Sequence, residues 1–94
     1  MFKIDRRNNI LISNGDNAIL DVSICGETLK EGDTIYFECT EQSHTITTFV
    51  DGVAKIHLEK RNEDHNGYYS MRAIMKDGRD CLVAQGKYVR KGLI

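Results

Sequence analysis

The chain of 94 residues is 40% hydrophobic and 29% charged, a composition typical of one globular domain and not of a disordered segment. Its formal net charge of −1 argues against a protein that binds the phosphates of nucleic acid, which would carry an excess of Lys and Arg. No apolar run approaches the roughly 20 residues that span a bilayer, and the first residues lack the apolar core of a signal peptide. We therefore expect no nucleic-acid partner, no membrane partner and no secretion by a signal peptide.

Hydrophobic and polar residues alternate with a period of two through the first half of the chain, which is typical of strands with one buried face. In one such segment, Ile35, Phe37 and Cys39 share a face. Asp51-Gly52 predicts a two-residue hairpin turn between two of the segments. We expect these strands over residues 18–24, 34–39, 45–50 and 54–58.

The second half contains a polar loop over residues 60–67, the longest predicted strand over residues 68–75, and a hairpin signal at Asp77-Gly78. A two-residue turn at Asp77-Gly78 places Ala73 opposite Leu82 and Met71 opposite Ala84, so that apolar residues face each other. The last predicted strand continues to Arg90, and Gly86 indicates a bulge or a bend within it.

The segment Asp64–Tyr69 resembles the corner before the sixth strand of immunoglobulin-like domains, where a tyrosine ring enters the core and its hydroxyl bonds back to the corner backbone. Tyr69 has the parity of Met71, so we expect Asp64, Gly67 and Tyr69 to form this structural corner. An exposed loop beside an amphipathic tyrosine is the alternative.

No segment shows a 3.6-residue apolar stripe, so we expect no long helix. The pattern predicts an all-β protein: one immunoglobulin-like β-sandwich domain over residues 1–94, with about seven to eight short antiparallel strands. The ends near residues 1–9 and 91–94 are expected to be loosely held.

Three cysteines are present, Cys25, Cys39 and Cys81, with no Cys-x-x-Cys pair among them. Since no signal peptide is visible, we expect reduced and mostly buried thiols; one disulfide plus a spare thiol is the alternative.

Several short motifs follow one another along the chain. They are Ile12–Asp16, Gly32–Phe37, Gly52–Leu58, Asp64–Tyr69, Lys76–Arg79 and Gly86–Val89. Their order resembles the N-terminal domain of phage baseplate upper proteins and their small prophage-encoded relatives. The order departs from that family at His65 and Ser70, where Thr and Asp are common.

This resemblance implies an immunoglobulin-like β-sandwich that serves as a structural or assembly module of a phage or prophage particle, associated with the tail, baseplate or fibre. It implies other virion proteins as partners, a homo-oligomer, and a location in the virion or, before assembly, in the cytoplasm of the host bacterium. It brings no catalytic residue and no cofactor.

The residues themselves also favour a protein that is not an enzyme. His44, His57 and His65 have no metal-binding spacing, so they are interpreted as solvated side chains. No Gly-x-Ser-x-Gly elbow or Walker-type loop occurs, and Cys39 lies on an apolar face, where a thiol is usually inert. We expect no catalytic, cofactor or metal site.

The candidate contact surface consists of Tyr36, Tyr68, Ile74 and Tyr88, whose parity places them outside the predicted core. Cover by the second sheet would explain some of them equally well. The alternative function is a carbohydrate- or cell-surface-binding module, with Tyr36, Tyr68 and Tyr88 as its aromatic platform. The absence of Trp counts against this function, because carbohydrate-binding platforms often use it.

Basic residues near both ends form one patch if the ends lie together, and such a patch contacts phosphate or an acidic partner. Ordinary solubilising charge is the alternative and the favoured interpretation. The residues are Arg6, Arg7, Lys87, Arg90 and Lys91.

Overall fold

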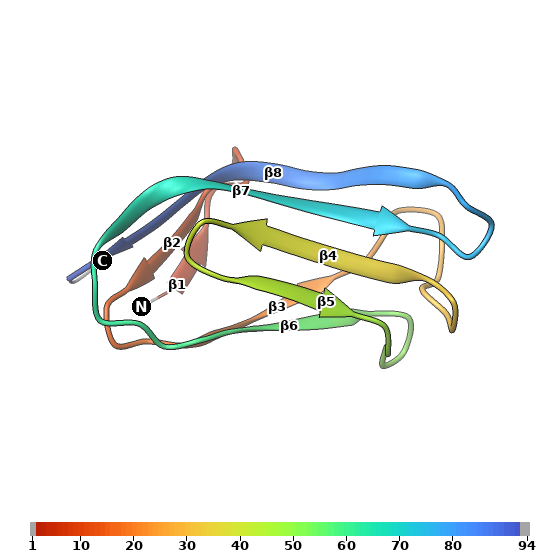
Figure 1. The fold of residues 1–94 in the computed structure, drawn as a ribbon, viewed down its shortest axis with the longest axis horizontal. Coiled ribbons are helices and arrows are strands. Elements are labelled where there is room, and N and C mark those ends of the chain that lie inside the picture. Colours follow the sequence, from red (N-terminus) through yellow and green to blue (C-terminus); the bar gives the residue numbers. More distant parts are fainter. Residues whose placement is uncertain (1, 93–94) are drawn as a thin grey trace.

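The computed structural model describes residues 2–92, which form eight strands and no helix (Figure 1). The predicted all-β class is thereby confirmed. With no helix in this range, there is none long and apolar enough to cross a membrane. The strands are β1 (Phe2–Ile4), β2 (Ile10–Ser13), β3 (Ala18–Val22), β4 (Thr34–Cys39), β5 (Ser43–Ile46), β6 (Ala54–Leu58), β7 (His65–Ile74) and β8 (Asp80–Lys91).

The strands form two sheets, one of six strands in the order β1-β2-β8-β7-β4-β5 and one formed by β3 and β6. Figure 1 shows the larger sheet curling over β3 and β6. Its strands pair antiparallel except β2 and β8, which run parallel. The prediction of short antiparallel strands is therefore wrong for this pair, and β7 and β8 are long, with 10 and 12 residues.

The core lies between the two sheets, and the alternation in the sequence explains it. Along β6 every second residue is buried, and the residues between them are exposed. Ile35 and Phe37 of β4 face the same core, each with 0% exposure. Because each strand has one apolar face, the sheets bury these faces against each other. The other buried apolar residues are Ile10, Ile12, Leu20, Val22, Leu29, Ala54, Ile56, Leu58, Tyr69, Met71, Ala73, Met75 and Tyr88.

The β7–β8 hairpin differs from its prediction in the length of its turn, and a bulge later restores the predicted pairing. Its turn has three residues, because the Met75 N–H donates to the Arg79 carbonyl, and Gly78 adopts a φ of +95°. Ala73 therefore pairs with Cys81 and not with Leu82. A bulge then restores the register, so that Met71 meets Ala84 as predicted.

The Asp51-Gly52 turn has the predicted two-residue form. Both residues have positive φ angles, and Val50 and Val53 exchange two hydrogen bonds across the turn. The segments on either side nevertheless belong to different sheets, because β5 pairs with β4 and β6 pairs with β3. This turn carries the chain from one layer to the other.

Several predicted strand boundaries differ from the structure, two of them by three residues or more. The strand expected over residues 45–50 ends at Ile46. The loop expected over residues 60–67 ends earlier, because β7 begins at His65 and its Gly67 pairs with Tyr88. Pairing with the long β8 outweighs the turn preference of Asn-Gly at this point.

Gly86 marks a close backbone contact, and the bulge of this hairpin lies opposite Met71 and Arg72 and not at Gly86. A Cβ atom at this position would lie 2.6 Å from the carbonyl oxygen of Asn8, in the β1–β2 turn. The Lys87 N–H donates to Asn9 Oδ1 at 3.0 Å beside it. The turn therefore packs against β8 because position 86 lacks a side chain.

Residues 2–9, which we expected to be loosely held, form β1 and this hydrogen-bonded turn. The Asp5 carboxylate accepts the N–H groups of Arg7 and Asn9 at 2.8 and 3.0 Å. These bonds from Asn9 and Arg7 outweigh burial and lower the pKa of Asp5. At the other end, β8 extends to Lys91, and residues 93–94 lie outside the described range.

The predicted tyrosine corner is not formed. The Tyr69 ring is buried, but its hydroxyl donates to the carbonyl of Asn8 in the β1–β2 turn. Gly67 lies within β7 and not at a corner, and Asp64 accepts a hydrogen bond from Asn14 Nδ2 at 2.8 Å. Tyr69 thus ties the first strands to the middle of β7.

Candidate functional site

The candidate site is the surface of the six-stranded sheet that points away from β3 and β6, here called the outer face. Register places its residues side by side: Tyr36 pairs with Arg72, and Arg72 pairs with Leu82. Residues that pair across antiparallel strands share a face. The outer face comprises Tyr36 and Glu38 of β4, Tyr68, Ser70, Arg72 and Ile74 of β7, and Asp80, Leu82 and Lys87 of β8.

The outer face concentrates exposed apolar side chains. Tyr68 is 71% exposed, Leu82 47% and Tyr36 37%, and these are three of the six large hydrophobic residues exposed within residues 2–92. Ile74 adds a partly exposed aliphatic side chain. A group of apolar residues with polar neighbours is the composition of an interaction surface.

A hollow of about 220 Å³ lies at the centre of the outer face, lined by Tyr36, Glu38, Ser70, Arg72, Ile74 and Asp80. The Arg72 guanidinium forms an ion pair with Asp80 at 2.9 Å. No partner for the Glu38 carboxylate is found among residues 2–92. The hollow therefore offers an aromatic ring, an aliphatic side chain and one carboxylate that is free to pair with a cation.

The structure brings together three of the four predicted contact residues, since Tyr36, Tyr68 and Ile74 all lie on the outer face. Tyr88 does not belong there, because it is 0% exposed and faces the core. Its ring packs near Phe37 and His65. The aromatic platform proposed for carbohydrate therefore loses one of its three tyrosines.

The contact surface predicted from the sequence did not include Arg72, Leu82, Glu38 or Asp80, although Glu38 shares the strand face of Tyr36 in that prediction. Leu82 was placed opposite Ala73, which would have turned it toward the core. The signal for Glu38 and Arg72 was the alternation itself, because each lies two residues from a residue already assigned to the face.

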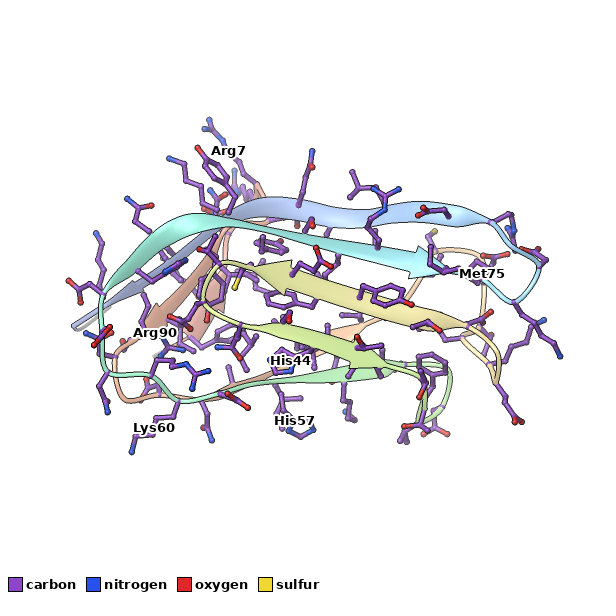
Figure 2. All side chains as sticks on the ribbon, in the orientation of Figure 1. Arg7, His44, His57, Lys60, Met75 and Arg90 are labelled. Atoms are coloured by element: carbon purple, nitrogen blue, oxygen red, sulfur yellow. The ribbon has the colours of Figure 1, made fainter. Side chains whose placement is uncertain are left out.

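A second cluster lies at one end of the molecule around Arg90, which is 0% exposed (Figure 2). Its Nε donates to Glu41 Oε2 at 3.0 Å. Nη1 donates to the carbonyls of Ser13 and Asp16 at 3.1 Å, and Nη2 donates to Glu41 and to the Glu59 carbonyl at 3.1 and 3.0 Å. Arg90 thus ties β8 to the segments that follow β2, β4 and β6.

The charges of the Arg90 cluster are balanced within the protein. Burial raises the pKa of Glu41, but hydrogen bonds from Arg90, Tyr88 and Gln42 outweigh it and hold the pKa below its usual range. Burial and then the hydrogen bond to Glu41 raise the pKa of the Tyr88 hydroxyl, which therefore stays protonated. Every donor direction of the Arg90 guanidinium is used inside the protein, so the cluster is structural.

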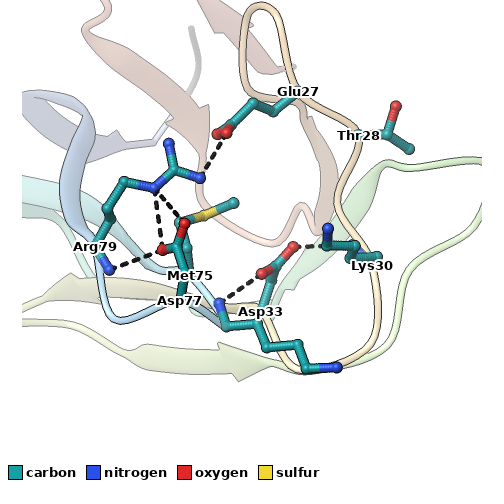
Figure 3. Close-up of a pocket in the computed structure, with 8 residues that line it drawn as sticks. Glu27, Thr28, Lys30, Asp33, Met75, Asp77 and Arg79 are labelled. Carbon is teal, nitrogen blue, oxygen red and sulfur yellow. Dashed lines mark hydrogen bonds and ion pairs between the residues drawn. The ribbon is translucent and has the colours of Figure 1, made fainter.

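Charged side chains also surround a hollow of about 650 Å³ at the opposite end, beside the β7–β8 turn (Figure 3). Arg79 pairs with Asp77 and Glu27 at 2.8 and 2.6 Å. The Asp33 carboxylate accepts the backbone N–H groups of Lys76 and Lys30, which lower its pKa. The carboxylates of this hollow are therefore already paired.

The histidines are engaged in different places. His44 Nε2 lies 2.7 Å from Gln42 Oε1, and His65 Nε2 lies 2.8 Å from Thr40 Oγ1. His57 is exposed and points away from β6 (Figure 2). Within the described chain, no three His, Cys, Asp or Glu side chains are placed to hold a metal ion. The interpretation of all three histidines as solvated is wrong for His44 and His65, which are both partly buried.

The cysteines are free thiols. Cys25 is exposed, which corrects the expectation that the thiols are mostly buried, while Cys39 and Cys81 are partly buried. Burial raises the pKa of the Cys39 thiol and so disfavours its reactive thiolate.

The basic patch that was weighed against ordinary solubilising charge lacks one of its five members. Arg90 is enclosed by its carboxylate and carbonyl partners, so it presents no charge to solvent. Arg6, Arg7, Lys87 and Lys91 are exposed.

No protein-family model, curated protein or solved structure matches this chain. The resemblance to the phage baseplate domain therefore stays a prediction.

Proposed function

We propose that the chain is a non-catalytic assembly module of a phage or prophage particle, associated with the tail, baseplate or fibre, which acts through protein–protein contacts at the outer face. The observation that carries the contact function is the grouping of exposed Tyr68, Leu82 and Tyr36 on one open sheet face. The assignment to a phage or prophage particle is supported by the order of the sequence motifs, which resembles that of the phage baseplate domain.

We further propose that the fold is immunoglobulin-like. The order β8-β7-β4-β5 corresponds to the G-F-C-C′ order of variable-type immunoglobulin sheets, and the β3–β6 pair corresponds to B and E. These correspondences support the proposal. The missing tyrosine corner removes one feature that is typical of such domains.

The experiment is incorporation into particles. Particles purified from an induced culture of the host are analysed by quantitative mass spectrometry, with the wild-type chain and with a variant carrying Tyr68→Thr and Leu82→Thr. We expect the wild type in particles at a fixed ratio to other virion proteins and the variant in the soluble fraction. Ile19→Thr is the matched control, because Ile19 is 54% exposed on β3, outside the outer face. A wild-type chain absent from the particles would contradict the proposal.

A further inference from the structure

We infer that the outer face packs against the same face of a second copy of the chain, related by a twofold axis that runs along the strands between β4 and β7. This inference rests on the proposed function, because it names the partner of the same surface. It follows from the position of three side chains and from the charge and size of the face.

Tyr36 and Arg72 are direct neighbours on adjacent antiparallel strands. A twofold axis midway between β4 and β7 exchanges the two positions, so Tyr36 of each copy lies over Arg72 of the other. A guanidinium over the face of an aromatic ring is attractive, and the symmetry forms this contact twice. A self-complementary pair of neighbours is what an isologous interface requires.

Glu38 completes the arrangement. It lies on the same face as Tyr36, two residues along β4, and no partner for its carboxylate is found within residues 2–92. In the twofold arrangement it comes diagonally beside Arg72 of the second copy. The backbones of packed sheets lie about 10 Å apart, so the long Glu38 and Arg72 side chains meet between the two sheets.

The net charge of the outer face suits a partner identical to itself. Arg72 and Lys87 supply two cations, and Glu38 and Asp80 supply two anions. A face with balanced charges does not repel its own copy, whereas a strongly basic or acidic partner finds no excess of opposite charge on it.

The length of the molecule leaves room for such an interface. The molecule measures 42 × 21 × 21 Å, and a stable interface takes about 800 Å² from each partner. A dimer of this kind therefore covers most of one long side of the molecule. The exposed rings of Tyr36 and Tyr68 and the Leu82 side chain supply the apolar centre that such an interface needs.

Variants with reversed charges at positions 38 and 72 test the inference. Their dimerisation is measured by sedimentation velocity over a range of protein concentrations. The variant Glu38→Arg carries two cations at the centre of the face, and Arg72→Glu carries only anions there. We expect a dimeric wild type and at least a tenfold weaker dimer for each single variant, because like charges meet in both. A one-to-one mixture of the two variants dimerises more tightly than either variant alone, because opposite charges meet again at positions 38 and 72 and one of the two Tyr36–Arg72 contacts is kept.

Circular dichroism and the midpoint of urea unfolding establish that each variant is folded. Ile19→Thr, on the other sheet, serves as the control that keeps the dimer. A monomeric wild type would overturn the inference, as would single variants that dimerise like the wild type or a mixture that stays monomeric. A wild type that is monomeric in solution but present in particles would contradict the self-association and leave the virion function standing. A wild type that dimerises but is absent from particles would contradict the virion function and leave the self-association standing.

Discussion

The Arg90 cluster and the outer face use polar and apolar side chains in opposite ways. At Arg90 a guanidinium and a carboxylate are buried, and each of their hydrogen bonds ends on another part of the same chain. On the outer face the large apolar side chains of Tyr68 and Leu82 meet solvent, and the carboxylate of Glu38 stands free of any partner within residues 2–92. The first region holds the fold, and the second has unused capacity for binding.

The difference shows how to separate stability from function in this molecule. A buried ion pair leaves an uncompensated charge when one partner is removed, so changes at Arg90 act on folding. Exposed residues contribute little to folding, so changes at Tyr68 and Leu82 act on contacts with other molecules. The predictions below test this separation, from the largest expected effect on stability to the smallest.

Removing the guanidinium has the largest effect. We expect Arg90→Ala to lower the free energy of unfolding by about 3–5 kcal/mol, since Glu41 is left buried without its cation. Urea unfolding measures this loss. Arg79→Ala is the matched control, because the Arg79 side chain is 53% exposed and pairs with exposed Asp77. An equal loss in both variants would contradict the distinction between the two arginines.

Removing the charge of Glu41 has the next largest effect, and the effect depends on pH. Glu41→Gln leaves Arg90 hydrogen-bonded but without a counter-charge, so we expect a loss of about 1.5–3 kcal/mol near neutral pH.

The pKa of Glu41 is lowered in the folded state, so its contribution is complete above the ordinary value of about 4.3 and declines as the pH falls toward the folded-state pKa. The difference in unfolding free energy between wild type and Glu41→Gln should therefore shrink from about pH 7 to about pH 3. A difference that stays constant over this range would show that the carboxylate charge is not what stabilises the cluster.

A methyl group at position 86 has an intermediate effect. Gly86→Ala brings a Cβ atom to 2.6 Å from the Asn8 carbonyl oxygen, which belongs to backbone and moves only with the whole turn. We expect a loss of about 1–2 kcal/mol from this overpacking. Thermal or urea unfolding measures it, and hydrogen exchange at the Lys87 amide reports whether the β1–β2 turn has moved. An unchanged stability would show that the turn does not depend on close packing against β8.

The double variant Tyr68→Thr with Leu82→Thr has the smallest effect on stability. Threonine keeps a high strand preference, so we expect a change within about 1 kcal/mol. The same variant should lose the contact made by the outer face. A large loss of stability would show that these side chains belong to the fold.

The sequence was sufficient where burial alternates strictly. Strands β4 and β6 were predicted from the period of two, because a strand with one buried face leaves this pattern whatever its partners are. The pairing of β2 with β8 was not predicted, because it joins segments about 80 residues apart and depends on tertiary contacts.

Tyr88 shows a signal that was present but not used. The register assumed for the β7–β8 hairpin, continued along β8, places Tyr88 opposite Gly67 and on the face of Tyr69. Its ring then turns to the core, and Arg90 follows it inward with the same parity. A charged residue at a core position indicates a buried counter-charge, but only the folded chain shows that Glu41 supplies it.

The central claim is that the outer face makes contacts with other molecules and is not needed for folding. Its most direct test measures two quantities on the variant with Tyr68→Thr and Leu82→Thr: the free energy of unfolding and the amount of the chain incorporated into particles. We expect an unfolding free energy within about 1 kcal/mol of the wild type together with loss from the particles. Incorporation at the wild-type level would contradict it.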